Sequence, residues 1–161
     1  MDSNTETFVY IVLGVVLAFM INQGMAYGLT TDMPVVAVES NSMIPVFYKG
    51  DILVLKGVPT EQLDVGDIVV YSVEGRSVPI VHRIVKINPD DSFQTKGDAN
   101  NGQLNFEYYV SPQSIHGKVV LIIPYLGWVK IGVTEYVLPN IIYLLVLCII
   151  IAAVYYGRRL I

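Results

Sequence analysis

Two long apolar runs stand near the two ends of the chain, and the sequence between them alternates short apolar stretches with turn-forming residues. The first run, residues 8–29, is apolar apart from Asn22 and Gln23, and as a helix it would extend about 33 Å. The second run, residues 136–156, contains the stretch IIYLLVLCIIIAAVYY. Each is long enough to cross the roughly 30 Å of hydrocarbon in a bilayer. The pattern therefore predicts an N-terminal and a C-terminal transmembrane helix.

The residues that flank the two runs indicate an orientation. Residues 1–7, MDSNTET, are acidic and lack the Lys or Arg of a cleavable signal peptide, which favours a retained anchor. Arg158 and Arg159 follow the second run, and basic residues beside a span tend to stay in the cytoplasm. We therefore expect a multi-pass protein of the cell membrane, with residues 1–7 and 157–161 in the cytoplasm and residues 30–135 on the extracytoplasmic face.

The segment 30–135 has the pattern of short β-strands. The stretches VVAV, DILVLKG, GDIVVYSV, IVHRIVKI and GKVVLIIPYLG are rich in Val and Ile and are bounded by Gly, Pro, Asp or Asn. Two other stretches, VPTEQLDVGD and NPDDSFQTKGDANNGQLN, are dense in turn formers and are expected to form turns and a longer loop. The expected fold class is mostly β, a small β domain flanked by two transmembrane helices.

Composition excludes several functional classes. With 161 residues the chain can build one modest domain, and its 53% hydrophobic residues and mean hydropathy of +0.55 exceed what a soluble domain usually shows. The net charge of −4 gives no basic surface for nucleic acid. Cys148 is the one cysteine and lies in the second apolar run, so the β domain has no disulfide of its own. The sequence has no zinc-type Cys and His spacing and no phosphate-binding loop, so we expect no metal and no cofactor.

Serine chemistry remains, and the sequence offers few partners for it. The stretch VESNSMIPVFYKGD carries Ser40 and Ser42, which form either a reactive site or a polar turn that leads into a strand. The two histidines are His82, in IVHRIVKI, and His116, in SIHGKVV. A histidine within a β-branched run can equally be a partly buried strand residue with one hydrogen bond.

Three aspartates of the predicted loop are candidate acids. Asp98 stands in KGDAN, where an Asp-initiated turn is the alternative reading. Asp90 and Asp91 are adjacent, and adjacent aspartates in a polar loop are usually solvated.

The motifs SNSMIP, GDI, GDIVVY, HRIVKI, KGDAN and GKVVLIIPYLGWV, in this order, resemble signal peptidase I of the archaeal and endoplasmic-reticulum type over residues 34–130. The resemblance implies a membrane-bound serine endopeptidase that removes signal peptides from exported preproteins after small residues at positions −1 and −3, without metal or cofactor. It also implies the bilayer, signal-peptide-bearing preproteins and the protein translocation machinery as partners, and no nucleic acid.

The same resemblance assigns roles to residues. It implies Ser42 as the nucleophile and His82 as the general base, at a position where bacterial members carry a lysine. A lysine base must lose about three pKa units to be neutral, whereas histidine near 6.5 needs almost no shift but needs its tautomer fixed. Asp98 is expected to orient His82, and the backbone N–H of Ser42 with the hydroxyl of Ser40 to bind the oxyanion. Residues 34–40, PVVAVES, are expected to form one wall of a peptide groove.

One position departs from the family pattern. Many members carry a second acid about six residues after the aspartate of the GD motif, where this chain has Leu104, with Asn105 and Glu107 nearby. This leaves open which acid belongs to the site, and it keeps an alternative function open. That alternative is a catalytically impaired, membrane-tethered β module that acts as an assembly or binding subunit.

Overall fold

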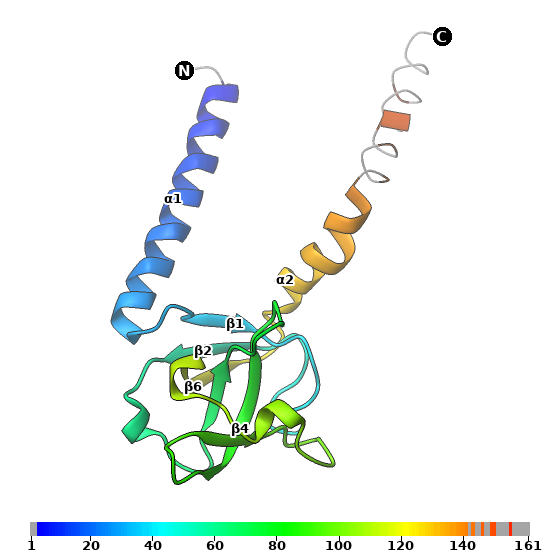
Figure 1. Ribbon diagram of the computed structural model, residues 1–161. Helices are drawn as coiled ribbons and strands as arrows, with labels where there is room; N and C mark the ends of the chain where they lie inside the picture. Colours follow the sequence, from blue (N-terminus) through cyan, green and yellow to red (C-terminus); the bar gives the residue numbers. More distant parts are fainter. Residues whose placement is uncertain (1–2, 142, 144–145, 147–148, 151–154, 156–161) are drawn as a thin grey trace.

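A β body with two helical segments makes up the protein (Figure 1). The computed structural model describes residues 3–141, 143, 146, 149–150 and 155. Both helical segments leave the β body on the same side, one preceding it in the chain and one following it. The beginning of the first helical segment and the last described helical residues therefore lie at the same end of the molecule.

Helix α1, Ser3–Leu29, is the N-terminal apolar run predicted from the sequence. None of its residues is buried, although the run is apolar on all sides. Within the described part of the chain it is the one helix long and apolar enough to cross a membrane, judged by length and composition.

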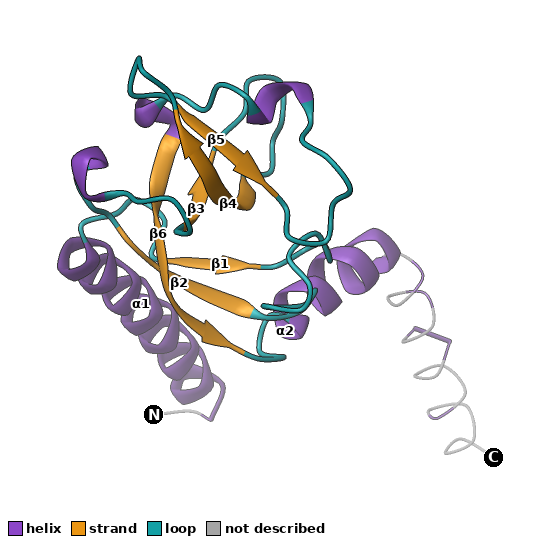
Figure 2. Ribbon diagram, turned by 90° about the horizontal axis from the view of Figure 1, so that it is seen from below, coloured by secondary structure: helices purple, strands orange, loops and turns teal. Residues whose placement is uncertain are grey.

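The sheet has six antiparallel strands in the order β1-β2-β6-β3-β4-β5, which places β1 and β5 at its edges (Figure 2). The strands are β1 Val35–Ala37, β2 Ile52–Lys56, β3 Ile68–Tyr71, β4 Ile80–Ile87, β5 Phe93–Lys96 and β6 Ile115–Ile123. The mostly β prediction is confirmed. Strand β5 is the exception, because it lies inside the stretch expected to be a loop. Its sequence, FQTK, lacks the Val and Ile run that marks the other strands.

Two groups of buried side chains form the core. The first contains Met43 and Phe47, which come from the loop between β1 and β2, with Val38, Leu53, Leu55 and Val70. The second lies under β3, β4 and β5 and contains Leu63, Val69, Tyr71, Ile84, Phe93 and Val110. Burial of a side chain such as Phe47 contributes about 1.5–3 kcal/mol, so the loop between β1 and β2 is anchored in the core.

Helical backbone begins again at Trp128, earlier than the start at residue 136 expected from the sequence. Helix α2, Trp128–Ile131, continues into a π-helical turn, Gly132–Val137, and a 3-10 turn, Leu138–Asn140. Much of the expected second span, 136–156, lies outside the described residues. Two aromatic residues near the start of this helical backbone are exposed, Tyr125 by 76% and Trp128 by 44%.

Candidate active site

Ser42 lies in a closed loop, residues 38–51, which we call the Ser42 loop. Its two ends are joined by backbone hydrogen bonds, Val38 N to Asp51 O at 2.9 Å and Gly50 N to Val38 O at 2.9 Å. Inside the loop the Asn41 side-chain oxygen accepts a bond from the Lys49 N–H at 2.8 Å. These bonds give the loop a fixed shape, with Ser42 beside the buried Met43.

Asp51, the aspartate of the GDI motif, ties the base of the Ser42 loop to a second segment. Its carboxylate is 4% exposed and accepts the backbone N–H groups of Tyr48 at 2.9 Å and Tyr125 at 3.0 Å. Because both carboxylate oxygens are used, this buried group needs no counter-ion.

His82 reaches Ser42 from the middle of β4. Side chains alternate between the two faces of a strand, and in β4 His82 and Ile84 point into the body. The distance from His82 Nε2 to Ser42 Oγ is 3.0 Å. The sequence predicted this pair from two motifs that have strands β2 and β3 between them, and the fold brings the two side chains together.

Glu107 occupies the other side of the His82 ring. One oxygen of its carboxylate contacts His82 Nδ1 in a short hydrogen bond, and the second oxygen accepts the N–H of Leu104 at 2.6 Å. The Glu107 side chain is fully buried. Since a carboxylate oxygen accepts, Nδ1 carries the proton and Nε2 is free to accept the hydroxyl proton of Ser42.

Asp98 does not make the contact with His82 that the sequence led us to expect. Its two oxygens bind Arg83 instead, at 3.0 Å from Nε and 2.5 Å from Nη2, and Arg83 Nη1 also donates to Gly66 O at 2.7 Å. Arg83 follows His82 in β4, so its side chain lies on the opposite face of the strand. The fold thus separates Asp98 from the imidazole and places Glu107 there.

The backbone of the KGDAN loop contacts both Ser42 and His82. Ala99 N donates to Ser42 O at 2.8 Å. Gly97 comes so close that a Cβ built on it would lie 2.8 Å from both His82 Nε2 and Ser42 O. A glycine at this position therefore lets the backbone approach the His82 ring and the Ser42 carbonyl.

Burial lowers the pKa of His82 below its ordinary value, because the charged imidazolium loses hydration when it is buried. The negative charge of Glu107 and its hydrogen bond raise this pKa, but they do not offset the effect of burial. His82 is therefore neutral near pH 7, the form that can accept a proton.

Ser40 also lies close to the Ser42 hydroxyl. The two hydroxyl oxygens, Ser40 Oγ and Ser42 Oγ, are 3.3 Å apart. Ser42 Oγ thus has both the His82 ring nitrogen and a second hydroxyl within hydrogen-bond distance. The role of Ser40 as a donor to the oxyanion stays a prediction.

A groove of about 430 Å³ opens at Ser42 and His82. One wall is formed by residues 36–40, the segment expected from the sequence to line it, and the other by residues 78–81, which lead into His82. Most of the lining is aliphatic, and Glu39, Arg76 and Lys130 bring charges to it. The groove is therefore a mainly apolar channel that ends at a serine and histidine pair.

The chain is similar in sequence to known peptidases. The Peptidase S24-like family model matches residues 17–120. The signal peptidase complex catalytic subunit SEC11 of Pyricularia oryzae is 40% identical over 130 residues, covering 74% of each chain. The SEC11C subunit of Rattus norvegicus is 36% identical over 138 residues, covering 80% of this chain and 71% of that protein. The human SEC11C subunit is 36% identical over 128 residues, covering 74% and 67%.

The chain belongs to the signal peptidase I family, of the archaeal and endoplasmic-reticulum type. Among its described residues no group of three or more Cys, His, Asp or Glu side chains could hold a metal ion. Ser42 contacts a histidine, which in turn contacts a buried carboxylate, and this arrangement suits acyl transfer through a serine nucleophile.

This family member carries a second serine, histidine and aspartate constellation. His116 Nε2 lies 2.7 Å from Ser72 Oγ, and its Nδ1 lies 3.0 Å from both oxygens of Asp32. The side chain of Asp32 is 68% exposed, whereas Glu107 is fully buried. His116 and Ser72 also lie outside the lining of the groove that contains Ser42.

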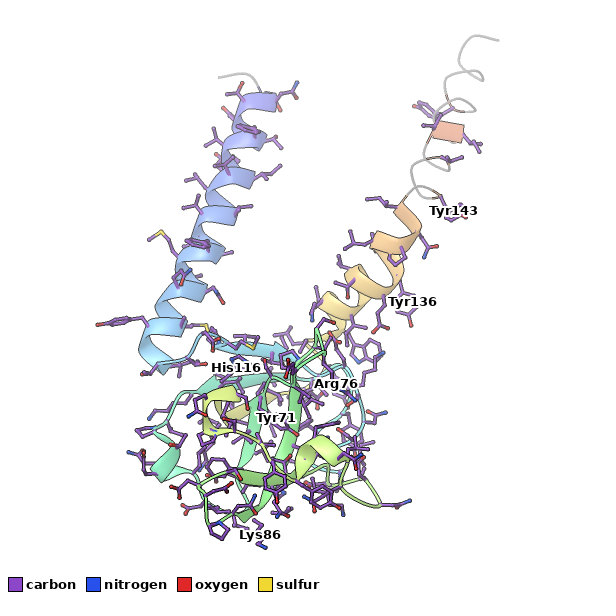
Figure 3. The ribbon with its side chains drawn as sticks, viewed as in Figure 1. Tyr71, Arg76, Lys86, His116, Tyr136 and Tyr143 are labelled. Atoms are coloured by element: carbon purple, nitrogen blue, oxygen red, sulfur yellow. The ribbon has the colours of Figure 1, made fainter. Side chains whose placement is uncertain are left out.

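Asp32 joins the end of α1 to the β body through this second constellation. The neighbouring Thr31 hydroxyl donates to His116 O at 2.7 Å, and Gly57 N donates to Leu29 O at 2.8 Å. In Figure 3, His116 lies at the end of the β body nearer the helices, and Lys86 lies at the opposite end. The bonds around His116 therefore attach the end of the N-terminal helix to the sheet.

Sequence reasoning missed Glu107 as the partner of His82, naming it only as a nearby substitute. Glu107 closes the 3-10 turn Asn105–Glu107, and the hydrogen bond from Leu104 turns its side chain back toward the chain. A glutamate in a turn is usually a solvated residue. The one available signal was its place shortly after KGDAN, where the family pattern asks for an acid.

Proposed function

We propose that the chain is a serine endopeptidase that removes N-terminal signal peptides from exported preproteins. Ser42 is the nucleophile, His82 the general base and Glu107 the acid that orients His82. The observation that supports this proposal best is the pair of hydrogen bonds that joins Ser42 to His82 and His82 to the buried Glu107. Ser42 and His82 also line a groove. Glu107 supplies a buried acid to His82 although the expected position carries Leu104, and this supports an enzyme over the alternative of a catalytically impaired assembly or binding subunit.

The reaction follows from the positions of the protons. Ser42 Oγ attacks the carbonyl carbon of the scissile bond while its proton passes to His82 Nε2. The imidazolium that forms is stabilised by the Glu107 carboxylate at Nδ1. His82 then gives the proton to the leaving amine, which leaves an acyl ester on Ser42. Water activated by the same histidine attacks the ester and releases the signal peptide with a free carboxylate.

The negative charge that develops on the carbonyl oxygen needs donors close to Ser42. We assign this role to the Ser42 backbone N–H and the Ser40 hydroxyl, which lies 3.3 Å from Ser42 Oγ. Loss of one such donor typically lowers kcat by about 10²- to 10³-fold.

An extended peptide fits the groove as an added strand. Strand β1 is an edge strand that pairs with β2 alone, so its other side is open to main-chain hydrogen bonds. The aliphatic side chains of Val36, Val38 and Val81 line the groove that contains Ser42. We propose that these apolar walls accept small side chains at positions −1 and −3 before the cut.

The two helical segments suit a membrane protein whose β body works at the surface of the bilayer. Helix α1 would be one span, and the apolar residues 136–156 would form the second, with both termini in the cytoplasm and the β body on the extracytoplasmic face. The departure of both helical segments from one side of the β body supports this arrangement. The relatives are named as subunits of a signal peptidase complex. We accordingly propose the bilayer, further subunits of such a complex and the translocation machinery as partners.

Cleavage of a purified preprotein in detergent tests the proposal. The wild type should release a mature protein with a new N-terminus after a small residue, and Ser42→Ala should release none above background. An inactive, folded wild type would favour the binding subunit, and full activity of Ser42→Ala would remove Ser42 as the nucleophile.

A further inference from the structure

The helical backbone that follows β6 contacts the Ser42 loop directly. We call residues 128–137, which comprise α2 and the π-helical turn, the C-terminal helical segment. Figure 1 shows this segment beginning beside β1 and rising away from the β body. The catalytic residues proposed above all lie outside it, so its contacts with the loop have no explanation in the reaction itself.

Backbone and ring contacts join the two segments at Gly50. The N–H of Gly127 donates to Gly50 O at 2.8 Å. The indole of Trp128 covers the same glycine, because a Cβ built on Gly50 would lie 2.1 Å from Trp128 Nε1. Gly50 also has a φ of +94°, which other residues rarely adopt. The end of the Ser42 loop is therefore shaped to accept the tryptophan ring.

Two ion pairs join the same segments on either side of Ser42 in the sequence. Glu39 binds Lys130 at 2.7 Å, and Lys49 binds both oxygens of Glu135 at 3.1 Å. The Lys49 ammonium also lies 5.9 Å from the centre of the Trp128 ring. These side chains are between 30% and 54% exposed, and such pairs add little to overall stability. Their effect is to fix the place of the loop relative to the helix.

We propose that the C-terminal helical segment positions Ser42 for attack, with Lys49, Glu135, Glu39 and Lys130 as positioning residues. The inference rests on the proposed peptidase function. Ser42 Oγ must stay close to His82 Nε2. The Ser42 loop is attached to the C-terminal helical segment by one ion pair before Ser42 in the sequence and one after it. A misplacement of reacting groups by about 1 Å can cost as much as 10²-fold in rate, so two weak ion pairs can have a large effect on catalysis.

A double charge-reversal cycle on Lys49 and Glu135 tests the proposal, because neither residue lines the groove. Lys49→Glu and Glu135→Lys, each alone, should lower kcat for preprotein cleavage on the order of tenfold and leave KM within about twofold of the wild type. The double variant restores an opposite pair and should recover most of the wild-type kcat. A pair that only stabilised the fold would lower the melting temperature of the single variants and leave the kcat of the folded protein at the wild-type value.

Lys118→Glu is the control, since Lys118 forms an ion pair with Asp67 at 2.6 Å and neither residue belongs to the Ser42 loop or lines its groove. It should keep the wild-type kcat. Single variants with wild-type kcat, or a double variant no faster than the singles, would overturn the positioning role. Wild-type activity and its loss in Ser42→Ala are measured in the same assay, so failure of the positioning role is separate from failure of the proposed function.

Discussion

Two carboxylates near the candidate site bind different partners. Glu107 is fully buried and holds His82, whereas Asp98 is partly exposed and holds Arg83. Sequence motifs pointed to Asp98 because it follows the glycine of KGDAN. The structure gives that aspartate a role in anchoring the KGDAN loop, whose backbone contacts Ser42.

Glu107→Gln and Asp98→Asn should therefore differ strongly. The Leu104 N–H keeps an oxygen of residue 107 turned toward it, so glutamine would present its NH₂ group to His82 Nδ1 and favour the wrong tautomer. We expect kcat to fall on the order of 10³- to 10⁴-fold, as when the orienting aspartate of other serine proteases becomes asparagine.

Asp98→Asn should change kcat by less than about tenfold, because it weakens one partly exposed ion pair. Steady-state kinetics on one preprotein compare the two variants, with circular dichroism as the check on folding. A larger loss in Asp98→Asn than in Glu107→Gln would return the orienting role to Asp98.

The lowered pKa of His82 sets the pH dependence of activity. Protonated His82 cannot accept the Ser42 proton, so kcat/KM should fall as the pH drops through this pKa, and the acid limb should lie below about pH 6.5. In the same range the unfolded chain binds a proton that the folded chain does not, so folding stability also falls with decreasing pH. A pH profile of kcat/KM checks this, and an acid limb well above pH 6.5 would mean that the charge of Glu107 outweighs burial.

At the scale of elements, the Ser42 loop is held by side chains that take no part in the reaction. Met43 and Phe47 enter the core, and Asp51 accepts two backbone N–H groups. The strands on either side were predictable from their Val and Ile content. The loop was not, because its shape depends on contacts with Tyr125 and Gly127, which are distant in the sequence.

Asp51→Asn should destabilise the protein by about 1–3 kcal/mol, because one of the two donors would then face an NH₂ group. Thermal or denaturant unfolding in detergent measures the change. Asp64→Asn is a suitable control, because Asp64 is exposed. An Asp51→Asn variant as stable as the wild type would show that these two bonds do not hold the loop.

At the scale of the whole molecule, the described residues contain two constellations of serine, histidine and acid, and one of these two lies at the groove. The sequence predicted the Ser42 and His82 pair through family motifs. It could not predict that His116 would contact Ser72 and Asp32, because these contacts depend on where the end of α1 lies relative to the sheet. The two sets differ in burial. In the Ser42 set, burial lowers the pKa of His82 and encloses the Glu107 carboxylate beside it.

The rate of preprotein cleavage in Ser42→Ala and Ser72→Ala tests the central assignment most directly. Both variants remove one hydroxyl hydrogen-bonded to a histidine, so they differ mainly in which constellation they alter. We expect Ser42→Ala to lose at least about 10³-fold in kcat/KM, and Ser72→Ala to stay within about threefold of the wild type. Retained activity in Ser42→Ala, or its loss in a folded Ser72→Ala, would contradict the assignment of Ser42, His82 and Glu107 as the catalytic set.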